Sequence, residues 1–192
     1  ASMAADWAAK TRRAVLDARP IWMVPQTHNL GNYAKNEADR RRGRTPTEAE
    51  MRSMAWQCIV EGATGLIFYS WFDVKRNPDV PFDEQWAWLK RIAAEIDRMA
   101  PVILSVEPTP DITVPGGAPE WLYWTTRRHD GKVYLLAVND GDGEGRVRFN
   151  LPGNATDVRE FSTDRRITVQ EGVIEDTFTP LAVHLYEIAP RR

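Results

Sequence analysis

Two short apolar runs of the sequence, at 21–24 and 66–69, are each followed by side chains that suit the recognition of a sugar. These side chains belong to Gln26, His28, Asn29, Ser70, Trp71 and Asp73. Amide, imidazole and hydroxyl groups hydrogen-bond to sugar hydroxyls, and an indole ring offers a flat apolar face for stacking. The pattern therefore predicts a carbohydrate-binding site in which the first five of these residues contact the substrate.

Asp73 is the only carboxylate close after the second run, and two roles are open to it. As the general acid of a hydrolase it would need a raised pKa; otherwise it is a loop or capping residue. Glycoside hydrolysis normally uses two carboxyl groups, about 5–5.5 Å apart in retaining enzymes and about 6.5–9.5 Å apart in inverting ones. Alternatives also stay open for His28, as a proton carrier, sugar ligand or polar surface residue, and for Trp71, as a sugar platform or a packing residue.

Charge and composition argue against several classes of partner. The chain has 192 residues, with 25 Lys and Arg against 27 Asp and Glu, and a net charge of −2. A near-neutral protein does not attract nucleic acid through its overall field, and we interpret the basic run at 40–44 as a solvated loop. No apolar run reaches the ~20 residues that cross a membrane. We therefore predict no nucleic-acid partner and no membrane.

Motifs for cofactors and metals are absent from the sequence. Cys58 is the single cysteine, so it forms neither an internal disulfide nor a paired-cysteine metal site. The segment 139–144 (NDGDGE) lacks the twelve-residue spacing of a calcium-binding loop and is typical of a hairpin turn. Phosphate-binding and zinc-protease motifs do not occur either. We predict no cofactor and no bound metal.

Residues 1–105 alternate between helical and strand patterns. The expected elements are helices at 4–18, 45–62 and 81–100 and strands at 21–24 and 66–71. In the second helix Thr45 suits the N-cap and Pro46 the first helical position, with Glu48 completing a capping box; Pro101 is expected to end the third. Such alternation predicts parallel strands covered by helices on their outer face, with Trp22 in the core.

The pattern changes to short strands and turns from residue 106. Asp130-Gly131 lies between two apolar runs, at 121–126 and 133–138, which is a strong hairpin signal. This half contains about seven short strands in all, which is typical of an antiparallel sandwich. The predicted fold class is α/β plus all-β, with domains at 1–105 and 106–192.

Three segments of the first half resemble a known family. They are 19–26 (RPIWMVPQ), 45–52 (TPTEAEMR) and 61–71 (EGATGLIFYSW). They are similar to the last β/α units of the TIM barrel in glycoside-hydrolase-like proteins, and the second half resembles the accessory β-sandwich that follows such barrels. The resemblance implies a partial (β/α)₈-type barrel segment whose site lies at the carboxyl ends of the strands.

The resemblance also shows what this chain does not supply. Many such enzymes carry a nucleophilic Glu where this sequence has Gln26, and a neutral amide cannot form a glycosyl ester. A full barrel needs about 250 residues, whereas residues 1–105 offer two strands. We expect the remaining strands to come from an upstream segment or another chain, including a second copy of this one packed along the first strand.

The sequence therefore predicts the C-terminal portion of a glycoside hydrolase, which hydrolyses O-glycosidic bonds. This portion supplies substrate contacts at the barrel rim and is incomplete for catalysis alone. The alternative is a non-catalytic carbohydrate-binding or structural module, in which Trp121, Tyr123 and Trp124 form a sugar-binding surface or pack between domains.

Overall fold

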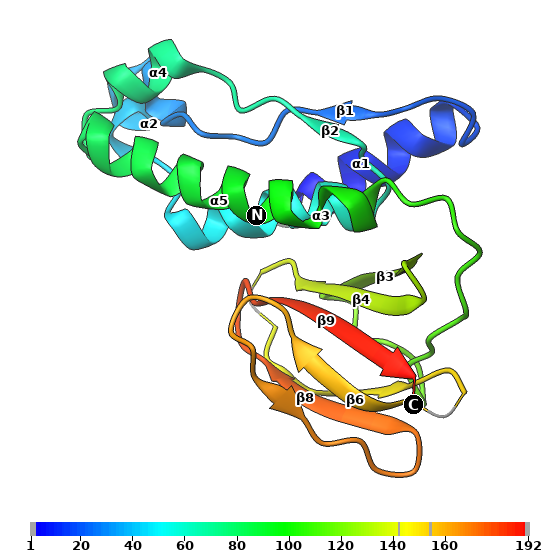
Figure 1. Cartoon of the computed structure of the whole chain (residues 1–192). Coiled ribbons are helices and arrows are strands. Elements are labelled where there is room, and N and C mark those ends of the chain that lie inside the picture. Colours follow the sequence, from blue (N-terminus) through cyan, green and yellow to red (C-terminus); the bar gives the residue numbers. More distant parts are fainter. Residues whose placement is uncertain (1–2, 142, 154, 191–192) are drawn as a thin grey trace.

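Helices and one pair of parallel strands make up the first half of the chain in a computed structural model that describes residues 3–141, 143–153 and 155–190 (Figure 1). The elements are α1 (Met3–Ala14), β1 (Trp22–Met23), the 3₁₀ turn η1 (Leu30–Tyr33), α2 (Glu37–Arg42), α3 (Glu48–Val60), β2 (Gly65–Leu66), α4 (Trp71–Arg76) and α5 (Phe82–Ile103). Strands β1 and β2 pair in parallel, and an isolated parallel bridge joins Gln26 to Tyr69 beyond them. The predicted parallel arrangement is confirmed, although each strand is shorter than its apolar run. No helix in the described ranges is both long and apolar enough to span a bilayer.

Two antiparallel sheets make up the second half, here called the β unit (residues 122–190). Its strands are β3 (Leu122–His129), β4 (Lys132–Asn139), β5 (Gly145–Asn150), β6 (Ala155–Glu160), β7 (Arg166–Ile167), β8 (Val173–Phe178) and β9 (Val183–Pro190). One sheet has the order β3-β4-β9-β6-β7 and the other pairs β5 with β8. Buried side chains from both sheets, including Leu135, Phe149, Ile174 and Tyr186, form one core cluster. The predicted hairpin at Asp130-Gly131 joins β3 to β4, and both residues have positive φ angles, 50° and 73°.

Helix α3 is buried on all sides because it lies between the β1–β2 pair and the β unit (Figure 1). On one side Met51 and Ala55 pack with Leu89 of α5. On the other side Trp56 and Val60 pack against apolar side chains of β4 and β9. The sequence predicted one apolar face for this helix; the second face belongs to the contact with the β unit.

A buried ion pair fastens the helices to the β unit. The carboxylate of Glu95 in α5, 8% exposed, accepts two hydrogen bonds of 2.8 Å from the Arg52 guanidinium in α3. It also accepts one from the Trp56 indole (3.0 Å) and one from the Ser162 hydroxyl (2.8 Å), which belongs to the β unit. Burial alone would raise the pKa of Glu95, but the Arg52 cation and these hydrogen bonds outweigh it and hold the pKa below its ordinary value.

The face of the β1–β2 pair that turns away from the helices is apolar and uncovered in the described chain. Its exposed side chains are Trp22 (65%), Val24 (55%), Ile67 (47%) and Tyr69 (53%). Neighbouring positions such as Ile21 and Leu66 pack on the helical side or are buried. Trp22, predicted in the core, is exposed in the described chain, where its indole lies against the backbone of Gly65 and a Cβ there would come within 2.8 Å of the ring.

Three local expectations also need correction. Thr47, not Thr45, caps α3 and forms the capping box with Glu50, because the hydroxyl and amide of Thr45 donate instead to Asp79. Helix α5 continues past Pro101 to Ile103, since the amide of Leu104 still donates to the carbonyl of Ala100. The basic run at 40–44, expected as a loop, begins inside helix α2.

Candidate functional site

The predicted site residues gather where β1 and β2 end. We call residues 26–29 and 69–73 the rim. The parallel bridge between Gln26 and Tyr69 joins its two halves, and the Thr27 hydroxyl donates to the Tyr69 carbonyl at 2.5 Å. The two groups of side chains that lie 40 residues apart in sequence therefore meet at one edge of the sheet, as expected for parallel strands.

Asp73 lies at the centre of this rim and is buried, with 2% exposure. Its carboxylate accepts a hydrogen bond from the Ser70 hydroxyl at 2.5 Å and another from the Tyr33 hydroxyl at 2.6 Å. Ser70 is also the N-cap of α4 and accepts from the Asp73 amide. The Ser70 hydrogen bond, and after it that of Tyr33, hold the pKa of Asp73 below its ordinary value. This is the opposite of what a general acid requires; Asp73 instead helps to fix the start of α4, where Ser70 is the cap.

His28 packs beside Tyr33 with an imidazole nitrogen that lacks a partner. The two rings meet edge to face, 5.2 Å between centroids and 77° between planes. The Nδ1 atom of His28 is buried and has no hydrogen-bond partner in the described chain. A buried polar atom without a partner costs stability, so this nitrogen is left unsatisfied beside the rim.

Asn29 is a scaffold residue rather than an open substrate contact. It is 3% exposed, and its side chain accepts from the Gly31 amide (2.7 Å) and donates to Asp79 (3.2 Å). Its backbone amide donates to Asn77 at 2.8 Å. These bonds fix the segment after β1 against the segment that precedes α5, so Asn29 determines the shape of the rim without presenting a free polar group.

Trp71 is one of three aromatic side chains that the rim presents to solvent, with Tyr69 and Phe72. It is 54% exposed and packs edge-on against Phe82, 6.1 Å between ring centroids. The Lys75 ammonium lies 4.4 Å from the centre of its ring. The indole is thus held in place on one side while retaining exposed apolar area.

Gln26 borders a hollow of about 250 Å³ beside the rim. Its side-chain amide donates to the His28 carbonyl at 2.9 Å, which leaves the amide oxygen free to accept. The hollow is lined by Gln26, Leu30, Arg42, Gly43, Arg44, Pro46, Glu50 and Met54.

Three residues that organise the rim were not predicted from the sequence. Tyr33 lies in the 3₁₀ turn η1, and Asn77 and Asp79 lie between α4 and α5. Burial would raise the pKa of Asp79, but hydrogen bonds from Thr45 and Asn29 lower it below its ordinary value. The dense polar composition of 26–36 and 77–79 was the one signal that could have indicated a hydrogen-bonded loop pair.

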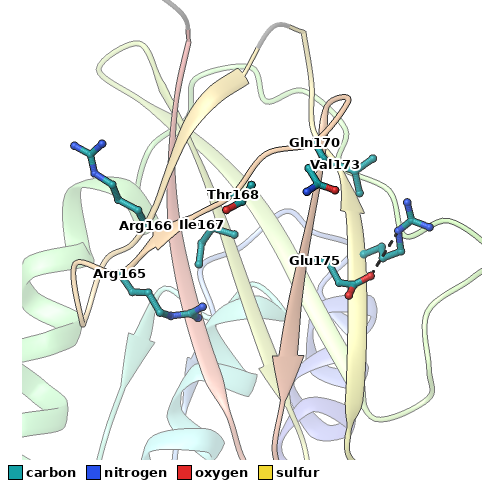
Figure 2. Close-up of a pocket in the computed structure, with 8 residues that line it drawn as sticks. Arg165, Arg166, Ile167, Thr168, Gln170, Val173 and Glu175 are labelled. Carbon is teal, nitrogen blue, oxygen red and sulfur yellow. Dashed lines mark ion pairs between the residues drawn. The ribbon is translucent and has the colours of Figure 1, made fainter.

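A second hollow, of about 390 Å³, lies in the β unit between β7 and β8 (Figure 2). Arg165 pairs with Asp176 at 2.5 Å, and Glu175 pairs with both Arg146, at 3.4 Å, and Arg148, at 3.9 Å. Figure 2 shows the side chain of Arg166 pointing away from Glu175 across the hollow. This hollow contains none of the predicted site residues.

Two of the three aromatic residues considered as a sugar surface, Trp121 and Trp124, pack inward. Trp121 and Trp124 both lie against the core of the β unit, and the Trp124 indole donates to the Ile112 carbonyl at 3.3 Å. The segment 139–144 joins β4 to β5, with Asp142 outside the described residues. In the ranges that the structure describes, no group of three or more His, Cys, Asp or Glu side chains is placed to hold a metal ion.

Comparison with solved structures finds several proteins with a similar fold. No protein-family model and no curated protein matches the chain. An α-amylase from Anoxybacillus aligns with 99% of this chain and 46% of its own, at 9% identity and a TM-score of 0.64. A GH27 β-L-arabinopyranosidase from Geobacillus stearothermophilus aligns with 100% of this chain and 42% of its own, at 13% identity and a TM-score of 0.60. The α-amylase from Geobacillus thermoleovorans, solved with acarbose, aligns with 90% of this chain and 40% of its own, at 13% identity and a TM-score of 0.58.

This chain spans less than half the length of each of these structures. At such low identity the similarity concerns the fold alone. The mixed helices and antiparallel sheets of this chain are similar in fold to part of each of these structures.

Proposed function

We propose that this chain forms the last β/α units of a glycoside hydrolase barrel and supplies sugar contacts at its rim. The observation that carries the proposal is the β1–β2 pair: helices cover one face, and the other face is apolar and open. A doubly wound sheet would carry helices on both faces, whereas a barrel strand packs its inner face against other strands. Trp22, Val24 and Ile67 are then interior residues of the barrel.

The edges of the β1–β2 pair support the same proposal. Along β1 runs a largely apolar groove of about 460 Å³, lined by residues that include Trp7, Trp22 and Cys58. Beside β2 lies another of about 340 Å³, lined by Leu66, Ile96 and further apolar side chains of α5. We propose that the remainder of the barrel, from an upstream segment or from another chain, fills both grooves. In one form of this proposal, the chain that packs along the β1 edge is a second copy of this one.

The sugar contacts that we propose are made by Gln26, His28 and Trp71. Gln26 offers a free amide oxygen, His28 a nitrogen without a partner, and Trp71 an exposed indole face. Ser70 and Asn29 act by fixing the rim, because their polar atoms are already bonded within it.

Catalysis on this proposal depends on carboxylates outside this chain. Gln26 has no acid–base chemistry, and Asp73 is held ionised by two short hydrogen bonds rather than poised to donate a proton. The 192-residue chain should therefore bind saccharides without hydrolysing them.

Tryptophan fluorescence titrated with maltopentaose and xylopentaose tests this function. Binding of either sugar should change the emission of the wild type, and Trp71→Ala should abolish the change. Trp124→Phe is the matched control, because Trp124 lies in β3 and packs against the core of the β unit, away from the rim. No change in wild-type emission with either sugar would overturn the proposal. Turnover of 4-nitrophenyl glycosides that disappears in Asp73→Asn would contradict the inactive assignment.

A further inference from the structure

The hollow beside Gln26 contains one positive charge that nothing in the described chain balances. Arg40 and Arg41 of α2 both pair with Glu37, at 3.3 and 3.0 Å. The guanidinium of Arg42, the last residue of α2, forms no hydrogen bond, ion pair or ring contact with any described residue. Its exposed side chain lines the hollow.

The other charges of the hollow cancel each other. Arg44 donates to both carboxylate oxygens of Glu50, at 2.6 and 2.5 Å. Glu50 also accepts from the Thr47 amide at 2.8 Å. The Arg44 guanidinium is the main cause that lowers the pKa of Glu50 to about 2, so this carboxylate remains ionised and paired. The net charge offered to a ligand is therefore that of Arg42.

Close backbone packing fixes Arg42 relative to the rim. Gly43 follows it directly, and a Cβ on Gly43 would lie 2.2 Å from the Gly31 nitrogen and 2.6 Å from the Asn29 side-chain oxygen. Only glycine permits this approach. The end of α2 is thus held against the segment that follows β1, and Thr45 is fastened to Asp79 just beyond. The position of Arg42 beside the rim is therefore determined by packing of the backbone.

The lining combines three kinds of group. Arg42 provides an unpaired fork of N–H donors, Gln26 a free amide oxygen, and Leu30, Pro46 and Met54 an apolar wall. An Arg fork matches the two oxygens of a carboxylate, the amide oxygen matches a hydroxyl donor, and the wall matches the C–H face of a sugar ring.

We infer that this hollow binds a carboxylate-bearing sugar, a uronic acid residue, through Arg42. The inference rests on the proposed function, because it names the class of saccharide that the rim takes. Arg42 acts as a specificity-determining residue that distinguishes acidic from neutral sugars.

Titration of the 192-residue chain with D-glucuronate and with its uncharged amide, D-glucuronamide, followed by NMR chemical shifts, tests the inference. At low salt the wild type should bind glucuronate at least about tenfold more tightly than the amide, since a charge-assisted pair replaces a neutral hydrogen bond. Arg42→Gln should reduce this preference to under about twofold. Arg41→Gln, on the same exposed helix but paired with Glu37, should retain it. Added salt should weaken the preference, because the pair is exposed.

Equal binding of glucuronate and glucuronamide, or a preference that survives in Arg42→Gln, would overturn the inference. If maltopentaose or xylopentaose still perturbs Trp71 in that case, the proposed rim function stands and only the acidic specificity fails. If the neutral sugars also leave Trp71 unperturbed, both fail.

Discussion

Replacing Arg52 by Met should destabilise the chain strongly at neutral pH, because it leaves the buried carboxylate of Glu95 without its cation. The Glu95 side chain is 10% exposed and that of Arg52 is 27% exposed. Breaking a buried ion pair by removing one partner costs about 3–5 kcal/mol. Trp56 and Ser162 still donate hydrogen bonds to the Glu95 carboxylate in this variant. We therefore expect a loss of stability at the low end of this range, about 3 kcal/mol.

The loss should also depend on pH in a definite direction. In the wild type the pKa of Glu95 is lowered. The ionised Glu95 therefore contributes its full share of stability above the ordinary carboxyl pKa, and this share is lost as pH falls through the lowered pKa of the folded state. In Arg52→Met, burial is no longer opposed by the cation and raises the pKa of Glu95. The folded variant then binds a proton that the unfolded chain releases, and its stability rises as pH falls. The difference from the wild type should therefore shrink between pH 7 and pH 4.

Urea unfolding at both pH values measures this difference. Arg91→Met is the matched control: Arg91 also makes two bonds of 2.8 Å to one carboxylate, that of Glu48, but its side chain is 59% exposed. Arg91→Met should lower the free energy of unfolding by at most about 1 kcal/mol. The double variant Arg52→Met with Glu95→Met should recover most of the lost stability. If Arg52→Met costs no more than Arg91→Met, or costs the same at both pH values, the reasoning about the buried pair is refuted.

Three further predictions concern single side chains. Gly43→Ala should destabilise the chain by about 1–3 kcal/mol in urea, because its Cβ meets backbone, whereas Gly141→Ala, with open space around it, should change stability little; equal effects would contradict the close packing. The Cys58 thiol, whose pKa burial raises to about 12, should react with a disulfide reagent at pH 8 only after unfolding, and rapid native reaction would contradict its burial. Trp22→Ser should reduce self-association in analytical ultracentrifugation, because it removes an exposed indole from the open face; unchanged association would show that this face is not involved.

Local sequence patterns predicted the elements well and their packing partners poorly. The parallel strands, the β3–β4 hairpin at Asp130-Gly131 and the gathering of the rim residues follow from periodicity and turn chemistry. The cap of α3 was misplaced because Thr45 and Thr47 both suit an N-cap, and only the tertiary bond from Thr45 to Asp79 decides between them.

Long-range contacts explain what the sequence could not predict. The burial of Trp56 in α3 depends on strands β4 and β9, which lie more than 70 residues further along the chain. The exposure of Trp22 depends on which strands pack over it. At the rim, the pKa of Asp73 is lowered first by the nearby Ser70 and then by Tyr33, 40 residues away, which pattern alone does not bring to it.

The most direct test of the central claim is an NMR map of the backbone and indole amides of the 192-residue chain during titration with xylopentaose and maltopentaose. The account predicts that the shifts gather at Gln26, His28 and the Trp71 indole, where the two parallel strands end. Shifts confined to the β unit, or no shifts with either sugar, would contradict it.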